Sequence, residues 1–252
     1  QAKTLFPYTT LFRSNFIAAQ ATKPFVILTG LSGSGKTKLA EATAYWLSED
    51  PEKQICMVAV GADWTNNEPL LGYADAINQG RYCAPASGIL QLLDHAQKTP
   101  KAPHFLILDE MNLSHVERYF ADFLSAMESS KPELALHGQG TLAAEKLLVP
   151  TRQALPRNLF IIGTVNVDET TYMFSPKVLD RANVIEFRVS AEQMSDFLAA
   201  PASSVNVKDL AGEGAHYAEA FVARAQLDTQ LEQDVATQLQ QNLIELFEPL
   251  SE

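Results

Sequence analysis

The residues best suited to chemistry lie in one glycine-rich stretch, Gly30-Leu-Ser-Gly33-Ser-Gly35-Lys36-Thr37. Its spacing matches G-x-x-x-x-G-K-[ST], a loop whose backbone N–H groups curl around phosphate oxygens. Glycines permit this close approach because they have no Cβ atom. The lysine can reach the outer phosphates, and the following hydroxyl can bind Mg²⁺. The stretch therefore predicts a phosphate-binding loop, with these contacts: Gly30, Ser32, Gly33, Ser34, Gly35, Lys36 and Thr37.

Two carboxylates follow an apolar run in the sequence Phe105-Leu-Ile-Leu-Asp109-Glu110. Such a run is typical of a strand that is buried on both faces. We expect Asp109, at the end of the strand, to hold Mg²⁺ together with Thr37. We expect Glu110 to polarise a water for attack on a γ-phosphate. The alternative is an acidic turn after a buried strand, which the preceding phosphate loop disfavours.

Two more polar residues lie next to the ends of predicted strands. Asn166 ends the apolar run 159–165, where a neutral amide can hydrogen-bond both a γ-phosphate and the attacking water. Arg181 lies between a predicted short helix and the fifth strand, and it can stabilise transition-state charge in a neighbouring subunit's site. The alternatives are a turn-forming asparagine, and a local ion pair of Arg181 with Asp180 or Glu186.

Alternating strands and helices must position these residues. Apolar runs bounded by Gly and Pro predict strands, and apolar stripes with helical spacing predict the helices between them. This alternation favours an α/β fold with three layers (α/β/α) around a five-stranded, mainly parallel sheet. Residues 134–140 and 146–149 fit either a hairpin or small inserted strands. The predicted strands begin near residue 25 and cover 54–60, 104–109, 159–165 and 184–187, while the helices begin near residue 36 and cover 87–97 and 116–127.

The chain divides into three predicted regions. Residues 15–190 form the α/β domain, and residues 191–252, rich in Ala, Gln and Glu, form a partial helical lid. An apolar stripe from Leu231 to Phe247 supports that helical lid. Residues 1–14 are set aside as artefact or disordered, because residues 4–14 resemble a translated sequencing-library adaptor. We expect the natural protein to extend beyond this sequence at its beginning, where the adaptor-like residues stand, and at its end, where the predicted lid is only partial.

Composition excludes several classes of protein. Hydrophobic residues make up 46% of the 252 residues, enough for a large core. No apolar run approaches the ~20 residues that a membrane-spanning helix needs. The two cysteines, Cys56 and Cys83, imply no disulfide framework and fit a reducing cytoplasm. A net charge of −11 argues against a broad nucleic-acid-binding face, although a narrow basic pore or a DNA-binding domain elsewhere stays open.

The order of the motifs resembles that of AAA+ ATPases: a phosphate loop, Leu-Asp-Glu, a strand-end Asn, then Leu-Asp-Arg before a strand. More narrowly, residues 105–113 (FLILDEMNL), 119–128 (YFADFLSAME) and 162–167 (IGTVNV) are similar to the McrB-like, dynein-related (MoxR-like) branch. The resemblance covers roughly residues 22–190. It implies ATP and Mg²⁺, and a homo-oligomeric ring, usually a hexamer, with sites between subunits. It also implies hydrolysis coupled to remodelling or translocation of a macromolecule, which in McrB-like restriction is DNA, with a nuclease as partner.

Three alternatives stay open. GTP is the nucleotide of McrB itself, but residues 167–170 (VDET) after Asn166 differ from the Thr-Ala-Asp-Arg associated with McrB, and the chain has no Asn-Lys-x-Asp guanine signature. A P-loop small-molecule kinase shares the phosphate loop, but it does not need Glu110, Asn166 and Arg181 in this order. The third alternative is a binding scaffold, in which nucleotide would only stabilise the assembly. The intact phosphate loop and acidic pair disfavour it.

Overall fold

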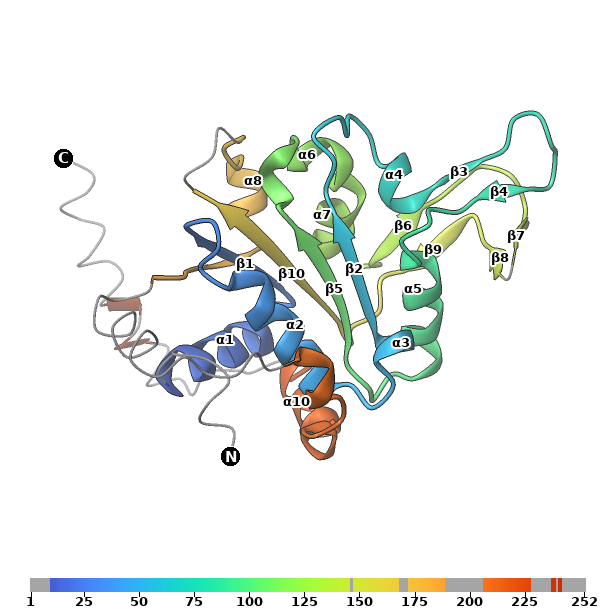
Figure 1. The fold of residues 1–252 in the computed structure, drawn as a ribbon. Helices are drawn as coiled ribbons and strands as arrows, with labels where there is room; N and C mark the ends of the chain where they lie inside the picture. The colour runs from blue at the N-terminus through green and yellow to red at the C-terminus, as the bar shows by residue number, and fades with distance from the viewer. Residues whose placement is uncertain are drawn as a thin grey trace.

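The sheet at the centre of the molecule has five parallel strands in the order β11-β1-β10-β5-β2 (Figure 1). The computed structural model describes residues 10–145, 147–167, 172–188, 206–227, 237–238 and 240–241. The predicted α/β class and the five-stranded sheet are therefore confirmed. The strands are β1 (Phe25–Gly30), β2 (Ile55–Ala59), β5 (His104–Asp109), β10 (Leu159–Asn166) and β11 (Asn183–Glu186).

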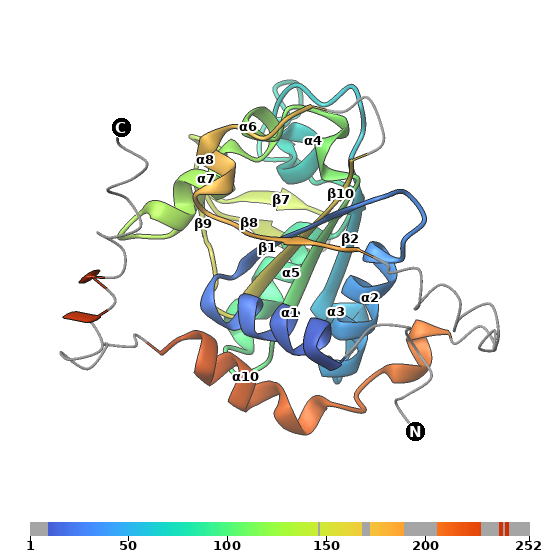
Figure 2. The same cartoon turned by 90° about the vertical axis from the view of Figure 1, so that its left-hand side faces the viewer.

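Helices cover both faces of this sheet, which gives three layers (Figure 2). Successive side chains of a strand point to opposite faces, so Phe25 and Ile27 join one apolar cluster and Val26 and Leu28 join the other. All four are fully buried, which explains why the inner strands read as nearly continuous apolar runs. One face is packed against α5 (Ile89–Lys98), α6 (Val116–Tyr119) and α7 (Ala121–Glu128), the other against α1 (Thr10–Thr22), α2 (Lys36–Leu47) and α10 (Ala218–Ala225).

The helix predicted at 116–127 is divided into α6 and α7. Phe120 lies between them with φ −107° and ψ 8°, outside helical geometry. Its ring stacks on Phe123 with centroids 4.6 Å apart and lies 5.6 Å from Phe25 of β1. The remaining short helices are α3 (Pro51–Gln54), α4 (Glu68–Leu71), α8 (Pro176–Leu179) and the 3₁₀ turns η2 (Met111–Leu113), η3 (Val207–Leu210) and η4 (Ala215–Tyr217).

Three small antiparallel strand pairs lie together beside α5 (Figure 1). Arg81 bridges to Ala143, so the hairpin after α4 is joined to the one before β10. The pairs are β3 (Tyr73–Ala74) with β4 (Tyr82–Cys83), β6 (Glu133–Ala135) with β9 (Arg152–Ala154), and β7 (Leu142–Ala144) with β8 (Leu147–Val149). The two segments 134–140 and 146–149 do not form a hairpin with each other: β6 pairs with β9, and β8 forms a hairpin with β7.

Residues 206–227, the longest described part of the predicted lid, pack onto the α/β domain. The Phe221 ring lies 4.6 Å from that of Phe160 in β10, and Tyr217 stacks on Trp46 near the end of α2. Helix α10 therefore joins the core through Phe221 and Val222 beside α1 and α2, at the opposite end of α2 from the phosphate loop (Figure 1). The apolar residues of the predicted stripe from Leu231 to Phe247 lie outside the described residues.

At the other end of the chain, α1 begins at Thr10, inside the region 1–14 that we set aside. Phe16 of this helix is 1% exposed and belongs to the same core cluster as β1. Residues 1–9 lie outside the described residues, and the adaptor origin of residues 4–14 stays a prediction. Over the described ranges, no helix combines the length and apolar character that crossing a membrane requires.

Candidate functional site

The three predicted motifs meet at one edge of the sheet. Strands β1, β10 and β5 are neighbours and run parallel, so their carboxyl ends lie side by side. Gly30 pairs with Asn166, and Gly163 pairs with Leu108 next to the acidic pair. Ligands of open α/β sheets bind outside the carboxyl ends of such strands. This edge is therefore where the chain's polar residues converge.

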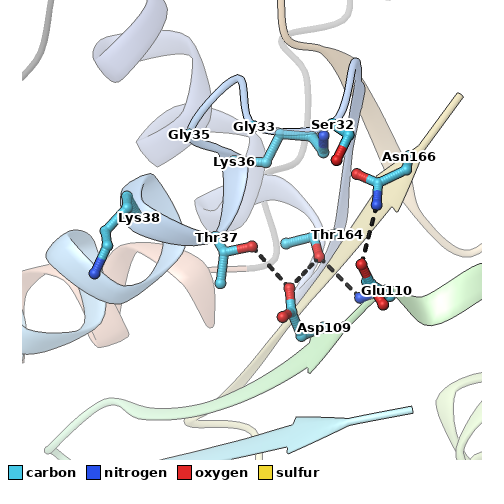
Figure 3. Close-up of a pocket in the computed structure, with 10 residues that line it drawn as sticks. All are labelled: Ser32, Gly33, Gly35, Lys36, Thr37, Lys38, Asp109, Glu110, Thr164 and Asn166. Carbon is cyan, nitrogen blue, oxygen red and sulfur yellow. Dashed lines mark hydrogen bonds between the residues drawn. The ribbon is translucent and has the colours of Figure 1, made fainter. Parts of the chain in front are cut away.

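A cavity of about 260 Å³ lies between the phosphate loop and the acidic turn (Figure 3). Two lining residues, Lys38 and Thr164, were not predicted from the sequence. Of the predicted residues, Gly30 and Ser34 contact the Lys36 side chain but do not line the cavity, and neither does Arg181. The lining consists of Ser32, Gly33, Gly35, Lys36, Thr37, Lys38, Asp109, Glu110, Thr164 and Asn166.

The phosphate loop has the backbone that an anion cradle needs. Gly33 has φ 69° and Gly35 has φ 100°, left-handed conformations that residues with a Cβ rarely adopt. Gly35 is the N-cap of α2, so this 12-residue helix begins at the cavity. A helix N-terminus carries roughly half a positive charge and favours phosphate. The loop therefore fits a polyphosphate.

Lys36 holds the loop together from inside. Lys36 is only 4% exposed. Its Nζ donates to the carbonyl oxygens of Gly30 at 2.9 Å and Leu31 at 2.6 Å. Nζ also lies 3.5 Å from Ser34 Oγ. A buried ammonium needs such partners, because its desolvation is otherwise very costly. Phosphate oxygens can take the place of these carbonyls.

The predicted cation ligands are in contact with each other. Thr37 Oγ1 donates to Asp109 Oδ1 at 2.7 Å (Figure 3). The described residues contain no cluster of three or more His, Cys, Asp or Glu that could hold a metal by themselves. Mg²⁺ is commonly bound through one or two protein oxygens plus substrate phosphates. One carboxylate and one hydroxyl beside a phosphate loop therefore fit Mg²⁺ carried by a nucleotide.

Glu110 and Asn166 form a second contact in the cavity. Asn166 Nδ2 donates to Glu110 Oε1 at 3.2 Å. Glu110 has φ 53° and ψ 47°, and among the described residues it is the one non-glycine residue with positive φ. Backbone strain of this kind costs about 1–3 kcal/mol and concentrates at functional sites. The strained backbone brings a carboxylate and a neutral amide together, where they can bind one water.

Arg181 is engaged elsewhere within the same chain. Its Nε donates to the carbonyl oxygen of Leu124 at 3.0 Å, and its Nη1 donates to that of Lys177. Nη2 forms an ion pair with Glu128, the last residue of α7, and the side chain is only 9% exposed. A cation at this position donates to one carbonyl of α7, that of Leu124, and complements the dipole of this helix. In a single copy, Arg181 therefore links α8 to α7.

The ion-pair partners that we considered for Arg181 are not its principal ones. Asp180 is 80% exposed and lies 4.0 Å from Arg181, so this pair is weak. Glu186 instead pairs with Arg188 at 2.6 Å. Glu128 is far from Arg181 in sequence, and no spacing rule could have found it. The role of Arg181 in a neighbouring site stays a prediction.

Thr164 was missed, although the sequence contains a signal. It is the one hydroxyl in the apolar run 159–165, and a polar residue in a fully buried strand needs a partner. Lys38 was missed because its charge is solvated. It is 64% exposed, pairs with Glu41 at 3.4 Å, and points away from the acidic pair (Figure 3).

Comparison with known proteins is limited to structure. No protein-family model matches the chain, and no curated protein matches it. One similar structure is closed-state Hsp104 with ATPγS and FITC-casein, which has a TM-score of 0.46 and 17% sequence identity, and the match covers 74% of this chain and 34% of that one. A second is the S. cerevisiae Hsp104–ADP complex, which has a TM-score of 0.47 and 16% identity, and the match covers 79% of this chain and 36% of that one. A third is NtrX from Brucella abortus, which has a TM-score of 0.47 and 17% identity, and the match covers 76% of this chain and 39% of that one. The chain thus spans between 34% and 39% of the length of these structures.

The site's own geometry therefore carries the chemistry. A phosphate loop, a hydroxyl–carboxylate pair and a second carboxylate with an amide meet at the carboxyl edge of a five-stranded parallel sheet. The chain has a three-layer α/β fold with a candidate polyphosphate site at the carboxyl edge of its parallel sheet.

Proposed function

We propose that this chain binds a nucleoside triphosphate with Mg²⁺ and hydrolyses it. One observation carries the proposal: the 2.7 Å hydrogen bond between Thr37, at the start of α2, and Asp109, at the end of β5. These residues are far apart in sequence, and the fold brings them together only at the phosphate loop. Their oxygens are the protein ligands that a Mg²⁺–triphosphate complex requires.

Binding is divided among the residues of the loop. The backbone around Gly33 and Gly35 cradles phosphate oxygens, with the N-terminus of α2 beneath them. Lys36 exchanges its contacts with loop carbonyls for the outer phosphates. Thr37 and Asp109 would hold the cation. Mg²⁺, when bound, neutralises and orients the phosphate oxygens.

Hydrolysis requires an activated water next to the γ-phosphate. The Glu110 carboxylate accepts a proton from that water, whose oxygen bonds to the γ-phosphorus as the bond to the bridging oxygen breaks. Asn166 Nδ2 lies 3.2 Å from Glu110 Oε1. The neutral amide therefore orients the carboxylate and the water without adding charge. The products are a nucleoside diphosphate and inorganic phosphate.

The finer proposal is that ATP is the nucleotide and that the chain belongs to a homo-oligomeric AAA+ ring that remodels or translocates a macromolecule. The order of motifs and the McrB-like stretches around Glu110 and Asn166 support it. In such a ring Arg181 would act in the neighbouring site. A GTP-using, DNA-directed system with a nuclease partner is the alternative within the same branch. The free cysteines Cys56 and Cys83 support a reducing compartment such as the cytoplasm.

The variant Glu110→Gln tests the proposal. It keeps shape and hydrogen-bonding capacity but removes the charge that accepts a proton, so we expect ATP binding with strongly reduced phosphate release. Binding is measured with a fluorescent nucleotide, and phosphate release in the presence and absence of Mg²⁺. Asp122→Asn is the matched control, because its carboxylate contacts Asn67 outside the cavity. Normal turnover by Glu110→Gln would show that another group activates water.

A further inference from the structure

Thr164 lies on β10, where its hydroxyl contacts both residues of the acidic pair. Its Oγ1 donates to Asp109 Oδ1 at 2.7 Å and accepts from the Glu110 backbone N–H at 3.1 Å (Figure 3). A hydroxyl has one donor and two acceptor sites, so a single group can make both bonds. The residue is 2% exposed. One buried oxygen atom is thus shared by the predicted cation ligand and the predicted catalytic residue.

For Asp109, Thr164 provides a contact that does not depend on the cation. Asp109 Oδ1 accepts hydrogen bonds from Thr37 and Thr164, both at 2.7 Å. Thr37 is the predicted cation ligand, so its hydroxyl would turn from Asp109 toward Mg²⁺. Thr164 comes from another strand and would keep its bond. The carboxylate would therefore stay oriented while Thr37 changes partner.

For Glu110, Thr164 supports a strained backbone. Its bond to the Glu110 N–H holds one side of the turn with φ 53°. The next residue, Met111, is held as well: its carbonyl accepts from Tyr119 OH at 2.8 Å, and a Cβ on Gly163 would lie 2.5 Å from its Sδ. Burial raises the pKa of Tyr119, which keeps this phenol a donor. Strained conformations persist where the surroundings fix them in this way.

We propose that Thr164 is a positioning residue for triphosphate hydrolysis, which uses one hydroxyl to fix the Asp109 carboxylate and the Glu110 backbone relative to each other. The inference rests on the proposed function, because it assigns Thr164 a part in that reaction. Thr164 acts through Asp109 and Glu110. Its loss should therefore reduce the catalytic step and leave nucleotide binding by the loop nearly intact.

The test replaces the hydroxyl and then restores it. Thr164→Val keeps the shape of the side chain but removes both hydrogen bonds, whereas Thr164→Ser keeps them. We expect Thr164→Val to lower kcat by about 10–100-fold, the range typical for partners that hydrogen-bond metal ligands. KM should stay within about threefold, because the loop still binds the phosphates. Thr164→Ser should recover most of the lost kcat.

Two further measurements exclude a general structural effect. The Glu110 amide should exchange with deuterium at least about tenfold faster in Thr164→Val than in wild type, because it has lost its acceptor. Thr99→Val is the matched control, since its Oγ1 donates to the His95 carbonyl at 2.8 Å in the loop that precedes β5. This control should retain kcat. If Thr164→Val fails to fold, Thr164→Ala repeats the test.

Three results would overturn the proposal: unchanged kcat in Thr164→Val, an equal loss in Thr164→Ser, or unchanged exchange of the Glu110 amide. A wild-type chain that binds no triphosphate or releases no phosphate would refute the proposed function instead. The exchange measurement requires no turnover, so it would still decide whether Thr164 holds the acidic turn.

Discussion

Strands β5 and β10 carry a polar cluster at each end, and the two clusters differ in burial and charge. The amino ends carry His104 and Asn158, which are 0% and 2% exposed. Asn158 Nδ2 lies 3.1, 3.0 and 2.7 Å from the carbonyl oxygens of Ala96, Thr99 and Ala102. Such a closed set of hydrogen bonds satisfies buried polar groups and fixes a loop.

The carboxyl ends carry charged groups that face an open cavity instead. Asp109 and Glu110 line it, together with Lys36 and Asn166. Glu110 also has a strained backbone, for which the amino-end cluster offers no counterpart among the described residues. Convergent charge, access and strain at one place indicate a functional site, whereas burial and complete hydrogen bonding indicate a structural one. Substitutions at the two ends should therefore separate activity from stability.

The largest expected effect concerns Arg181. Arginine fingers contribute roughly 10³–10⁵ in rate to phosphoryl transfer, so Arg181→Ala should bind nucleotide but scarcely hydrolyse it. In mixed rings with Glu110→Gln, some interfaces would combine an intact Glu110 with an intact Arg181, and phosphate release should partly return. Rings are identified with labelled subunits. Mixed rings that form and stay inactive would refute a shared site.

The contacts of Arg181 with α7 supply a control for this prediction. Glu128→Gln removes its ion-pair partner but leaves the guanidinium in place. If Arg181 only links α8 to α7, Glu128→Gln and Arg181→Ala should both lower the melting temperature slightly and keep hydrolysis. If Arg181 stabilises the transition state, Glu128→Gln should keep hydrolysis while Arg181→Ala loses it.

The next largest effect is expected at Lys36, whose Nζ would exchange two carbonyl partners for phosphate oxygens. Charge-assisted hydrogen bonds contribute about 1.5–3 kcal/mol each, so Lys36→Ala should weaken triphosphate binding about 100-fold or more. A fluorescent-nucleotide titration measures this. Lys53→Ala is the control, because that lysine is 63% exposed and pairs with Asp50 outside the cavity. Equal nucleotide affinities in the two variants would show that Lys36 does not contribute to triphosphate binding.

These predictions rest on motifs that the sequence revealed because their chemistry is local. The phosphate loop needs its glycines, lysine and threonine at fixed spacing within one turn, and an apolar run ending in Asp109 and Glu110 shows where a buried strand ends. The register of parallel strands then brings Asn166 next to Gly30. For this reason the sheet, its strands and most of the cavity lining were predictable.

What could not be predicted depends on contacts between distant segments. The role of Thr164 depends on its hydrogen bond to Asp109 of the neighbouring strand β5. Glu128 contacts Arg181 only because the fold places α7 next to the end of α8. The small hairpins joined by Arg81 and Ala143 are too short for a clear alternating pattern. The packing of residues 206–227 onto α1 and α2 follows from Phe221 and Val222 entering the core, whereas composition alone indicated only helix.

At the amino ends, Asn158→Ala should change stability and leave activity intact. The variant leaves three carbonyl oxygens without the Asn158 amide donor. Burying groups without partners costs about 1–3 kcal/mol, so the free energy of unfolding measured with urea should fall by that amount. Nucleotide affinity and kcat, measured well below the melting temperature, should match wild type. A selective loss of kcat would contradict the separation of the two ends.

The smallest effect is a pH dependence at His104. Burial lowers its pKa from 6.5 to about 4, and its Nε2 lies 2.8 Å from His95 Nδ1, an arrangement suited to a neutral ring. Between pH 6.5 and 4 the unfolded chain therefore binds a proton that the folded chain does not. Stability from this residue is complete above pH 6.5 and falls as the pH drops toward 4, by at most about 1.4 kcal/mol per pH unit. His104→Gln removes the imidazole that binds this proton. It should lower stability at pH 7 but reduce the additional loss between pH 7 and pH 5, measured by urea unfolding at both values. An equal pH-dependent loss in the variant and wild type would show that groups other than His104 bind the proton.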